Sequence, residues 1–259
     1  MTDIPKSRLY ALPTGLVYIT KDARKQETRR HAATILASLE DEPVEVVIDG
    51  AQIRGHSILI KPGAQRTLTQ APPGLLSINI DPWHPEFQRF RGWQHSQSAF
   101  ALDLGLRDTS PSLLDRCQSG CEQVDDVVSL FEFCADRVTR LMPETPSADR
   151  RVLSVIDRIN ATEPDLCQFA DLAEHAGVSE NHLSHIFTDN LGISMRSLRL
   201  WHKLRLAMKR MVGLDTLTTI AHDCGFSDSA HFSRSFHTAL GLKPSFIADR
   251  KHVDLHLCG

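Results

Sequence analysis

The spacing of apolar residues changes once along the chain, near residue 112. From about Leu16 to Ile80, short apolar runs alternate with turn-prone pieces such as EDEP, DGAQ and APPG. Apolar runs of strand length, separated by residues that favour turns, predict a series of short β-strands. The first half is therefore expected to be a β-sandwich or small barrel.

After Ser112 the apolar residues recur every three or four positions, which predicts helices. The second predicted helix, residues 122–142, carries more apolar residues than one face against a small barrel needs. This surplus fits either a homodimer formed through residues 122–142 or simple packing within a monomer. The next piece, MPETPSA at 142–148, has two prolines, which prevent a helix from continuing. We predict domains at 1–142 and 149–259, joined by a linker at 143–148.

The most informative pattern is a repeat in the second half. LAEHAGVSENHLSHIFTDNLGIS at 172–194 resembles IAHDCGFSDSAHFSRSFHTALGLKP at 220–244. Each copy has an Ala four residues before a Gly, then an apolar residue and a Ser. In a helix-turn-helix unit the small Ala lets two helices cross closely, and the Gly supplies a positive φ in the turn. The Ser, which is Ser179 or Ser227, is expected to cap the second helix. The fold class is thus α+β, with an all-α second half.

One long helical pattern, Ser194–Met211, joins the two copies. Its basic residues are Arg196, Arg199, Lys203, Arg205, Lys209 and Arg210, and no Asp or Glu occurs between Asp189 and Asp215. This local positive charge, which the net charge of -3 conceals, suits contact with phosphates. A solvated basic face is the alternative. Such a helix can hold two reading helices about one DNA turn apart, ~34 Å.

The region 151–250 resembles the DNA-binding domain of the AraC/XylS transcriptional regulators. The resemblance is carried by IAHDCGFSDSAHFSRSFHTALGLKPS and by Lys203-Leu204 with Ala207. Ile247 and Ala248 stand where the family usually has Tyr-Arg, so one phosphate contact of the family is not expected. The resemblance implies a sequence-specific, DNA-binding activator or repressor with a variable, often cupin-like, effector or dimerisation domain. Double-stranded DNA is its expected partner, and RNA polymerase is a further one.

The resemblance also implies which residues contact DNA. Family members read bases from the exposed face of the second helix of each unit. The expected base-reading residues are Asn181, Ser184, His185, Ser229, Ala230, Ser233 and Arg234. The expected phosphate contacts are Ser179, Arg196, Arg199, Lys203 and Ser227. A guanidinium can bond a guanine edge with about 1–3 kcal/mol of discrimination. A phosphate contact and an intramolecular ion pair are the alternatives for Arg234.

The piece Gly55–Thr67 resembles the second half-motif of a cupin barrel, in which a metal-binding His follows a Pro-Gly turn. Here the residues after Pro62-Gly63 are Ala64, Gln65 and Arg66, so that His is missing. His31 alone does not make a metal site, which needs three or four ligands. We therefore expect a cupin-like domain without metal, cofactor or enzymatic activity. The alternative function is a cupin-type metalloenzyme that carries a DNA-binding domain.

The aromatic and basic segment PWHPEFQRFRGWQ at 82–94 offers a candidate effector site. Trp83, Arg89, Arg91 and Trp93 could line a pocket for an anionic small molecule. The alternative, which we favour, is that the aromatic residues close the end of the barrel.

Composition limits the cellular setting. A chain that is 41% hydrophobic and 24% charged is typical of a soluble globular protein. No apolar run approaches the ~20 residues that span a bilayer, and the start lacks a secretion signal, so a cytoplasmic protein without membrane contact is expected. Cys117 and Cys121 could form a redox pair, although small buried apolar side chains are the favoured interpretation.

Overall fold

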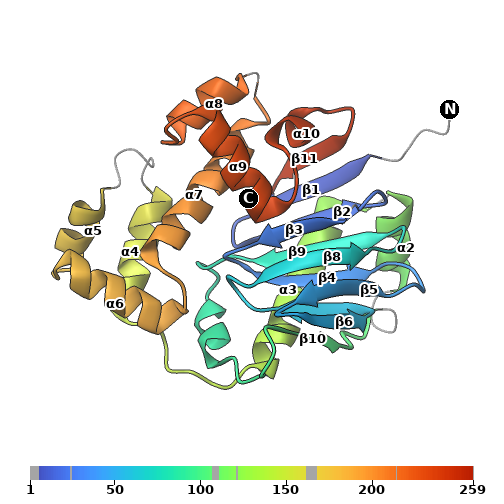
Figure 1. The fold of residues 1–259 in the computed structure, drawn as a ribbon, viewed down its shortest axis with the longest axis horizontal. Helices are drawn as coiled ribbons and strands as arrows, with labels where there is room; N and C mark the ends of the chain where they lie inside the picture. Colours follow the sequence, from blue (N-terminus) through green and yellow to red (C-terminus); the bar gives the residue numbers. More distant parts are fainter. Residues whose placement is uncertain are drawn as a thin grey trace.

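The computed structural model describes residues 6–23, 25–106, 111–120, 122–161, 168–213 and 215–258. Two facing β-sheets form the first half and helices form most of the second, which confirms the α+β prediction (Figure 1). The larger sheet has the strand order β10 (Ala99–Leu102), β7 (Ser57–Ile60), β4 (Ala33–Ser38), β9 (Leu75–Ile80), β2 (Gly15–Thr20), β1 (Ser7–Leu12) and β11 (Val253–Leu257). The smaller sheet has the order β3 (Gln26–Arg29), β8 (Gln65–Gln70), β5 (Val44–Ile48) and β6 (Ala51–Gly55).

Helices follow the sheets along the chain. They are η1 (Phe87–Gly92), α2 (Pro111–Ser119), α3 (Val124–Leu141), α4 (Arg150–Ala161), α5 (Phe169–His175), α6 (Glu180–Leu191), α7 (Met195–Arg210), α8 (Leu217–Asp223), α9 (Ser229–Leu240) and α10 (Pro244–Ala248). Residues 143–149 between α3 and α4 form neither helix nor strand. The division into domains at this segment stays a prediction.

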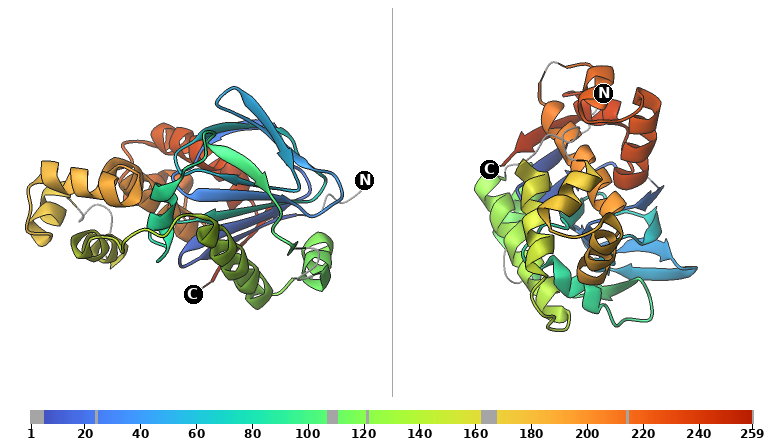
Figure 2. Two further views of the ribbon diagram at one scale, coloured as in Figure 1. Left: turned by 90° about the horizontal axis from the view of Figure 1, so that it is seen from below. Right: turned by 90° about the vertical axis from the view of Figure 1, so that its left-hand side faces the viewer.

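The larger sheet is covered on both faces, which explains why β4 is an unbroken run of buried residues. Successive side chains of a strand point to opposite faces. Ile35 therefore joins the core under α3, whereas Leu36 joins the core between the two sheets. Seen from below, α3 crosses the outer face of the larger sheet (Figure 2). The sheets thus enclose an apolar interior, as expected of a sandwich or small barrel.

Helix α3 uses its apolar side against its own sheet. It buries Val127, Leu130, Phe131, Cys134, Ala135 and Val138 there. At its two ends Val124 and Leu141 stay 39% and 53% exposed. The apolar surplus of 122–142 is therefore largely used within the monomer, and a homodimer through this helix stays a prediction.

The smaller sheet leaves the inner face of β1 and β2 uncovered, and the C-terminal helices cover it instead. Leu9 and Leu16 from these strands share one core with Trp201 of α7 and with residues of α9 and α10. A second core joins η1 and α3 to the helices α4 to α6. The two halves of the chain are therefore joined by continuous apolar packing.

A buried ion pair lies inside this junction. Asp81, which follows β9, accepts a hydrogen bond from the Trp201 indole N–H at 2.7 Å and pairs with Arg205 Nε at 3.1 Å. The Arg205 guanidinium also donates to the carbonyl oxygen of Leu12. Asp81 is fully buried, and burial raises the pKa of its carboxyl to about 6 although Arg205 acts in the opposite direction. Helix α7 is thus fixed to the sheet by polar as well as apolar contacts.

One strand lies where only helix is predicted. β11 joins the larger sheet parallel to β1, with Ser7 opposite Val253 and Ala11 opposite Leu257. The sequence VDLHL does alternate apolar and polar residues, but one short alternation is weak beside the helical patterns before it. The C-terminal segment therefore returns to the N-terminal sheet.

Two other expectations concern cysteines and membranes. Cys117 is buried, and burial together with Glu122 raises the pKa of its thiol to about 12, which disfavours thiolate chemistry. Its predicted redox partner Cys121 lies outside the described residues. In the described part of the chain, no helix combines the length and apolarity that crossing a membrane requires.

The Asp81–Arg205 pair generates a stability prediction. Arg205→Met leaves a buried carboxylate without its counter-ion, which should lower the free energy of unfolding by about 3–5 kcal/mol. The loss should be largest above pH 6, where Asp81 is ionised, and should shrink at lower pH because the raised pKa favours the protonated carboxyl in the folded state. The measurement is urea unfolding across this pH range. Asp81→Asn/Arg205→Met is the control and should recover most of the loss; a double variant as unstable as the single one contradicts the account.

Candidate DNA-binding surface

The first helix-turn-helix unit consists of α5, a tight turn and α6. Gly177 in the turn has a φ of +67°, which glycine adopts at no steric cost. The Val178 N–H returns to the Ala173 carbonyl at 3.0 Å and closes the turn. Ser179 caps α6 by accepting the His182 N–H at 3.3 Å. The Ala, Gly and Ser of the repeat therefore have the predicted local roles in this unit.

The second unit, α8 to α9, has the same turn but a different cap. Gly225 has a φ of +70°, and the Phe226 N–H bonds the Ala221 carbonyl at 2.9 Å. The helix cap is Asp228, which accepts the His231 N–H at 2.6 Å, so the prediction that Ser227 caps this helix was wrong. The connection is one residue longer here, which explains why the register of the two copies slips after Ser227.

The predicted reading faces are accessible. On α9, Ser229, Ala230, Ser233 and Arg234 are exposed, whereas Phe232 and Phe236 are buried in the core. On α6, Asn181 and His185 are exposed and Ser184 is half-buried. Helix α7 joins the two units and holds them at its opposite ends (Figure 1). Two surface helices are thereby held in a fixed relation to each other.

A cationic groove of about 420 Å³ lies between the two units. Its polar lining includes Ser184, Arg196, Arg199, Lys203 and His231, and its apolar lining includes Phe169, Leu200 and Phe226. Three of the five predicted phosphate contacts therefore meet in one groove, beside the N-terminal part of α9. The other two, Ser179 and Ser227, lie at the exposed starts of the reading helices.

Several basic residues of α7 are engaged in contacts within the protein. Lys203 donates to the Gly225 carbonyl, and its ammonium lies 5.7 Å from the centre of the Phe226 ring. Arg205 is buried with Asp81, and Arg210 pairs with Asp223 of α8 at 2.8 Å. The acid-free stretch therefore supplies structural contacts as well as surface charge. Arg196 and Arg199 are the residues of this stretch that best suit a phosphate backbone.

The four residues predicted to bind an effector do not line one cavity. Trp83 bonds the Pro13 carbonyl at 2.9 Å and contacts His202, and Trp93 is buried with its indole N–H on the Gln97 carbonyl at 2.9 Å. Arg89 pairs with Glu86 at 2.5 Å. Arg91 is exposed, close to Gly192 at the end of α6. Phe87 and Phe90 of η1 are buried in the core that η1 and α3 share with α4 to α6, rather than in the core between the two sheets.

A different cavity, of about 440 Å³, opens between the two sheets and the end of α9. Arg30 and Arg66, both buried, contribute to its lining together with Tyr18, Thr28 and Ser77. Its apolar lining is Leu36, Leu68, Leu75, Leu240, Leu242 and Phe246. The sequence signal for this site is Arg66, which follows the Pro62-Gly63 turn where a cupin would have its metal-binding His.

The cavity lining carries more cations than anions, with Lys25, Arg30, Arg66 and Lys243 against the one carboxylate of Asp22. Arg30 donates to Ser77 Oγ and Asn79 Oδ1, each at 2.8 Å, and Arg66 donates to Thr34 Oγ1 at 3.3 Å. These partners are neutral, and neither guanidinium forms an ion pair with another described residue. Arg66 Nη1 is buried without any hydrogen-bond partner. Burial lowers the pKa of Arg30 to about 10 and that of Arg66 well below its usual range. A bound anion would compensate both desolvated charges.

The fold and the surface define a two-part protein with tandem helix-turn-helix units. Residues 172–250 match a family described as "Helix-turn-helix domain". The arabinose operon regulatory protein of Escherichia coli is 34% identical over 106 residues, which are 39% of this chain and 35% of that protein. An uncharacterized HTH-type transcriptional regulator of Staphylococcus aureus is 34% identical over 89 residues, which are 34% of this chain and 12% of that protein. The chain thus spans about a third or less of these curated relatives.

A solved structure extends the likeness to the whole fold. An apo variant of ToxT from Vibrio cholerae has a TM-score of 0.60 at 12% identity, covering 91% of this chain and 97% of that one. Unsaturated fatty acid-bound ToxT gives 0.57 at 12% identity, covering 90% and 93%. This likeness shows a shared fold. The match at 172–250 shows that this region is a helix-turn-helix domain, and it is similar to part of the arabinose operon regulatory protein.

The exposed position of Arg234 on α9 generates a prediction about DNA reading. Arg234→Ala should weaken binding about tenfold on a preferred operator and little on random DNA, because a lost guanine contact affects one sequence position. Arg196→Ala is the matched control and should weaken both DNAs alike while lowering the salt dependence. Fluorescence anisotropy at several salt concentrations measures both. Equal losses on the two DNAs for Arg234→Ala would assign Arg234 to a phosphate.

Proposed function

We propose that this protein is a sequence-specific DNA-binding transcriptional regulator controlled by a small anionic molecule. The observation that carries the DNA-binding part is the pair of helix-turn-helix units at the ends of α7. Each unit presents an exposed second helix, and the groove between them contains Arg196 and Arg199. An α-helix fits the major groove of DNA, and basic side chains beside it contact phosphates. RNA polymerase as a partner stays a prediction.

The relatives support this proposal in part. The proteins that match the C-terminal region include the arabinose operon regulatory protein and regulators described as HTH-type. The matching region is the one that holds both units. Regulation of transcription by the present chain is therefore inferred from its DNA-binding half.

The cavity lined by Arg30 and Arg66 supports the control by an anionic effector. A carboxylate is the anion that best suits two guanidiniums, because planar forks of N–H groups match its two oxygens. The leucines and Phe246 around the cavity favour an apolar body attached to that carboxylate. A neighbour of the same fold, ToxT, has been crystallised with an unsaturated fatty acid. We therefore propose a monocarboxylate with an apolar chain or ring as the effector of this protein.

Arg30 gives this cavity a direct connection to the second unit. Its Nε and Nη2 donate to the carbonyl oxygens of Ala239 and Leu240, each at 3.1 Å. These carbonyls end α9, the helix that carries the predicted reader Arg234. An anion that binds Arg30 would compete with these carbonyls for the guanidinium, so occupancy of the cavity would change how firmly α9 is held.

A cupin-type metalloenzyme is the alternative function, and the structure favours it less. Ala64, Gln65 and Arg66, and no His, follow the Pro62-Gly63 turn, and Arg66 lines the cavity. Within the described ranges, no three His, Cys, Asp or Glu side chains are grouped so that they could hold a metal ion. Buried guanidiniums are cations, and they would repel a metal ion in the same space.

The DNA-binding part is tested by selecting preferred sequences from a random duplex library with the purified full chain. We expect an enriched motif with two half-sites about one helical turn apart, ~10 base pairs, because α7 holds both units at once. Asp228→Ala should weaken binding through the second half-site, since the first turn of α9 loses its cap. Recovery of no motif, with a folded protein, would contradict the proposal.

The effector part is tested by calorimetric titration with a monounsaturated fatty acid below its critical micelle concentration. Arg66→Gln should weaken binding at least tenfold, because it removes one of two buried cations. Arg89→Gln is the matched control and should bind as the unchanged protein does, because Arg89 lies outside the cavity. Stability should not fall in Arg66→Gln, since a buried unpaired charge is lost. Equal affinity of Arg66→Gln and the parent would contradict the proposed site.

A further inference from the structure

β11 is the last strand of the larger sheet, and no other strand of the described residues pairs with its outer edge. Open edges are places where a second chain can add a strand, and proteins often protect them with Pro, a bulge or Lys. β11 contains no Pro, no bulge and no Lys, its one charged residue Asp254 pairs with Lys6, and Leu257 near its end is 46% exposed. Leu257 is one of four exposed large apolar side chains among the described residues, and the others are Val124, Leu141 and Leu153.

The backbone of β11 has a defined direction of hydrogen bonding. The Ser7 N–H bonds the His252 carbonyl at 2.9 Å, and the Cys258 N–H bonds the Ala11 carbonyl at 3.0 Å. The backbone N–H and C=O groups of the even-numbered residues therefore point toward β1. Because these directions alternate along a strand, the N–H and C=O groups of Leu255 and Leu257 point to the open edge.

The sequence of β11 is complementary to itself in the antiparallel direction. When two copies of VDLHL pair around a two-fold axis at Leu255, the two Leu255 residues form a hydrogen-bonded pair. Leu257 then lies opposite Val253 of the second copy. Asp254 lies opposite His256 of the second copy, where an imidazole N–H can donate a hydrogen bond to the carboxylate, and this contact occurs twice.

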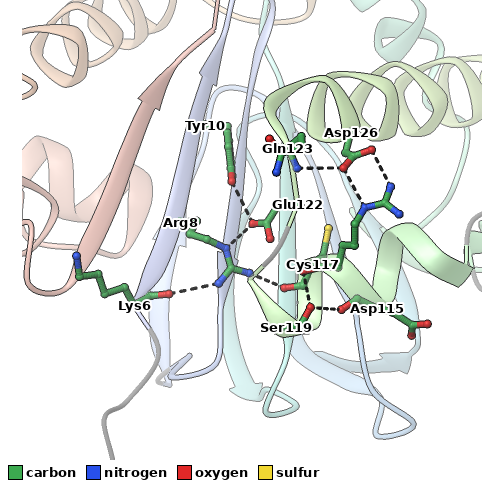
Figure 3. Close-up of polar contacts among 10 residues, drawn as sticks. Lys6, Arg8, Tyr10, Asp115, Cys117, Ser119, Glu122, Gln123 and Asp126 are labelled. Carbon is green, nitrogen blue, oxygen red and sulfur yellow. Dashed lines mark hydrogen bonds and ion pairs between the residues drawn. The ribbon is translucent and has the colours of Figure 1, made fainter.

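Strand β11 is held firmly enough to serve as a template. Lys6 pairs with Asp254 at 3.1 Å, and the Tyr10 and His256 rings stack with centroids 4.6 Å apart. On the neighbouring strand β1, the Arg8 guanidinium pairs with the carboxylate of Glu122, which also accepts the Tyr10 hydroxyl at 3.1 Å (Figure 3). This network fixes β1 to the segment before α3, so the edge strand rests on a rigid neighbour.

We propose that β11 pairs with β11 of a second copy of this chain, giving a homodimer with one sheet continuous across both subunits. A second copy is the partner that fits this edge, because antiparallel pairing places Leu257 opposite Val253 and Asp254 opposite His256. The proposal does not rest on the proposed function. It differs from a dimer through α3, which lies on the face of the sheet rather than at its edge (Figure 2).

The test uses two charge variants of the full chain, analysed by sedimentation velocity over a dilution series. Asp254→Lys places a lysine opposite His256 of the second copy, and His256→Asp places an aspartate opposite Asp254. Each variant alone should dimerise about tenfold more weakly than the parent, because Asp254→Lys removes the carboxylate that faces His256, and His256→Asp places two carboxylates opposite each other, in both cases twice per dimer. An equimolar mixture of the two variants should restore dimers, because the introduced lysine of one chain then meets the introduced aspartate of the other. Restored assembly cannot come from general loss of folding.

Two further variants test whether the edge of β11 forms the interface. Leu255→Pro removes an N–H at the open edge while the bonds to β1 remain, so it should abolish the dimer and leave the melting temperature of the monomer nearly unchanged. Lys251→Glu alters charge just outside the strand and should dimerise like the parent. A parent chain that stays monomeric at millimolar concentration overturns the proposal, as does a dimer that Leu255→Pro leaves intact, which would assign assembly to another surface such as α3.

Discussion

The buried contact of Asp81 with α7 is the interaction on which the arrangement of the molecule depends. One carboxylate receives the Trp201 indole at 2.7 Å and the Arg205 guanidinium at 3.1 Å, and Arg205 also reaches the Leu12 carbonyl. These bonds fix the helix that carries both helix-turn-helix units to the inner face of the larger sheet. They also explain why the acid-free sequence of α7 does not produce an equally basic surface. Part of its charge is used to join the two halves.

The same uncovered part of the sheet gives the N-terminal half access to the second unit. The smaller sheet stops short of β1 and β2, so α7, α9 and α10 complete the inner layer. The cavity lies where the smaller sheet meets the end of α9. Arg30 lines this cavity and also bonds the Ala239 carbonyl at the end of α9. A ligand in this place would contact the barrel and the DNA-binding part together. In the proposed function, this arrangement would connect effector binding to DNA reading through buried contacts between the two halves.

The sequence predicts features that depend on local geometry and fails where distant segments meet. The Ala and Gly spacing predicted both turns because a close helix crossing and a positive φ restrict residue choice directly. Burial of Arg205 could not be predicted, because its partner Asp81 is far away in sequence. β11 has too few residues for its pattern to compete with the helices before it. The sequence shows Arg66 and no His after the Pro62-Gly63 turn. That Arg66 belongs to the cavity proposed to bind an anion could not be predicted, because Arg30, the second guanidinium of the cavity, comes from the segment between β3 and β4.

The central claim is that two apolar cores join the sheets to the helix-turn-helix units, so that the described chain behaves as one folding unit. Differential scanning calorimetry of the full chain tests this most directly. Shared packing by Trp201, Leu9 and Leu16 predicts a single transition whose calorimetric and van't Hoff enthalpies agree. Arg205→Met should shift that transition to lower temperature without splitting it. Two separate transitions in the unchanged protein, one for each half, would contradict the account.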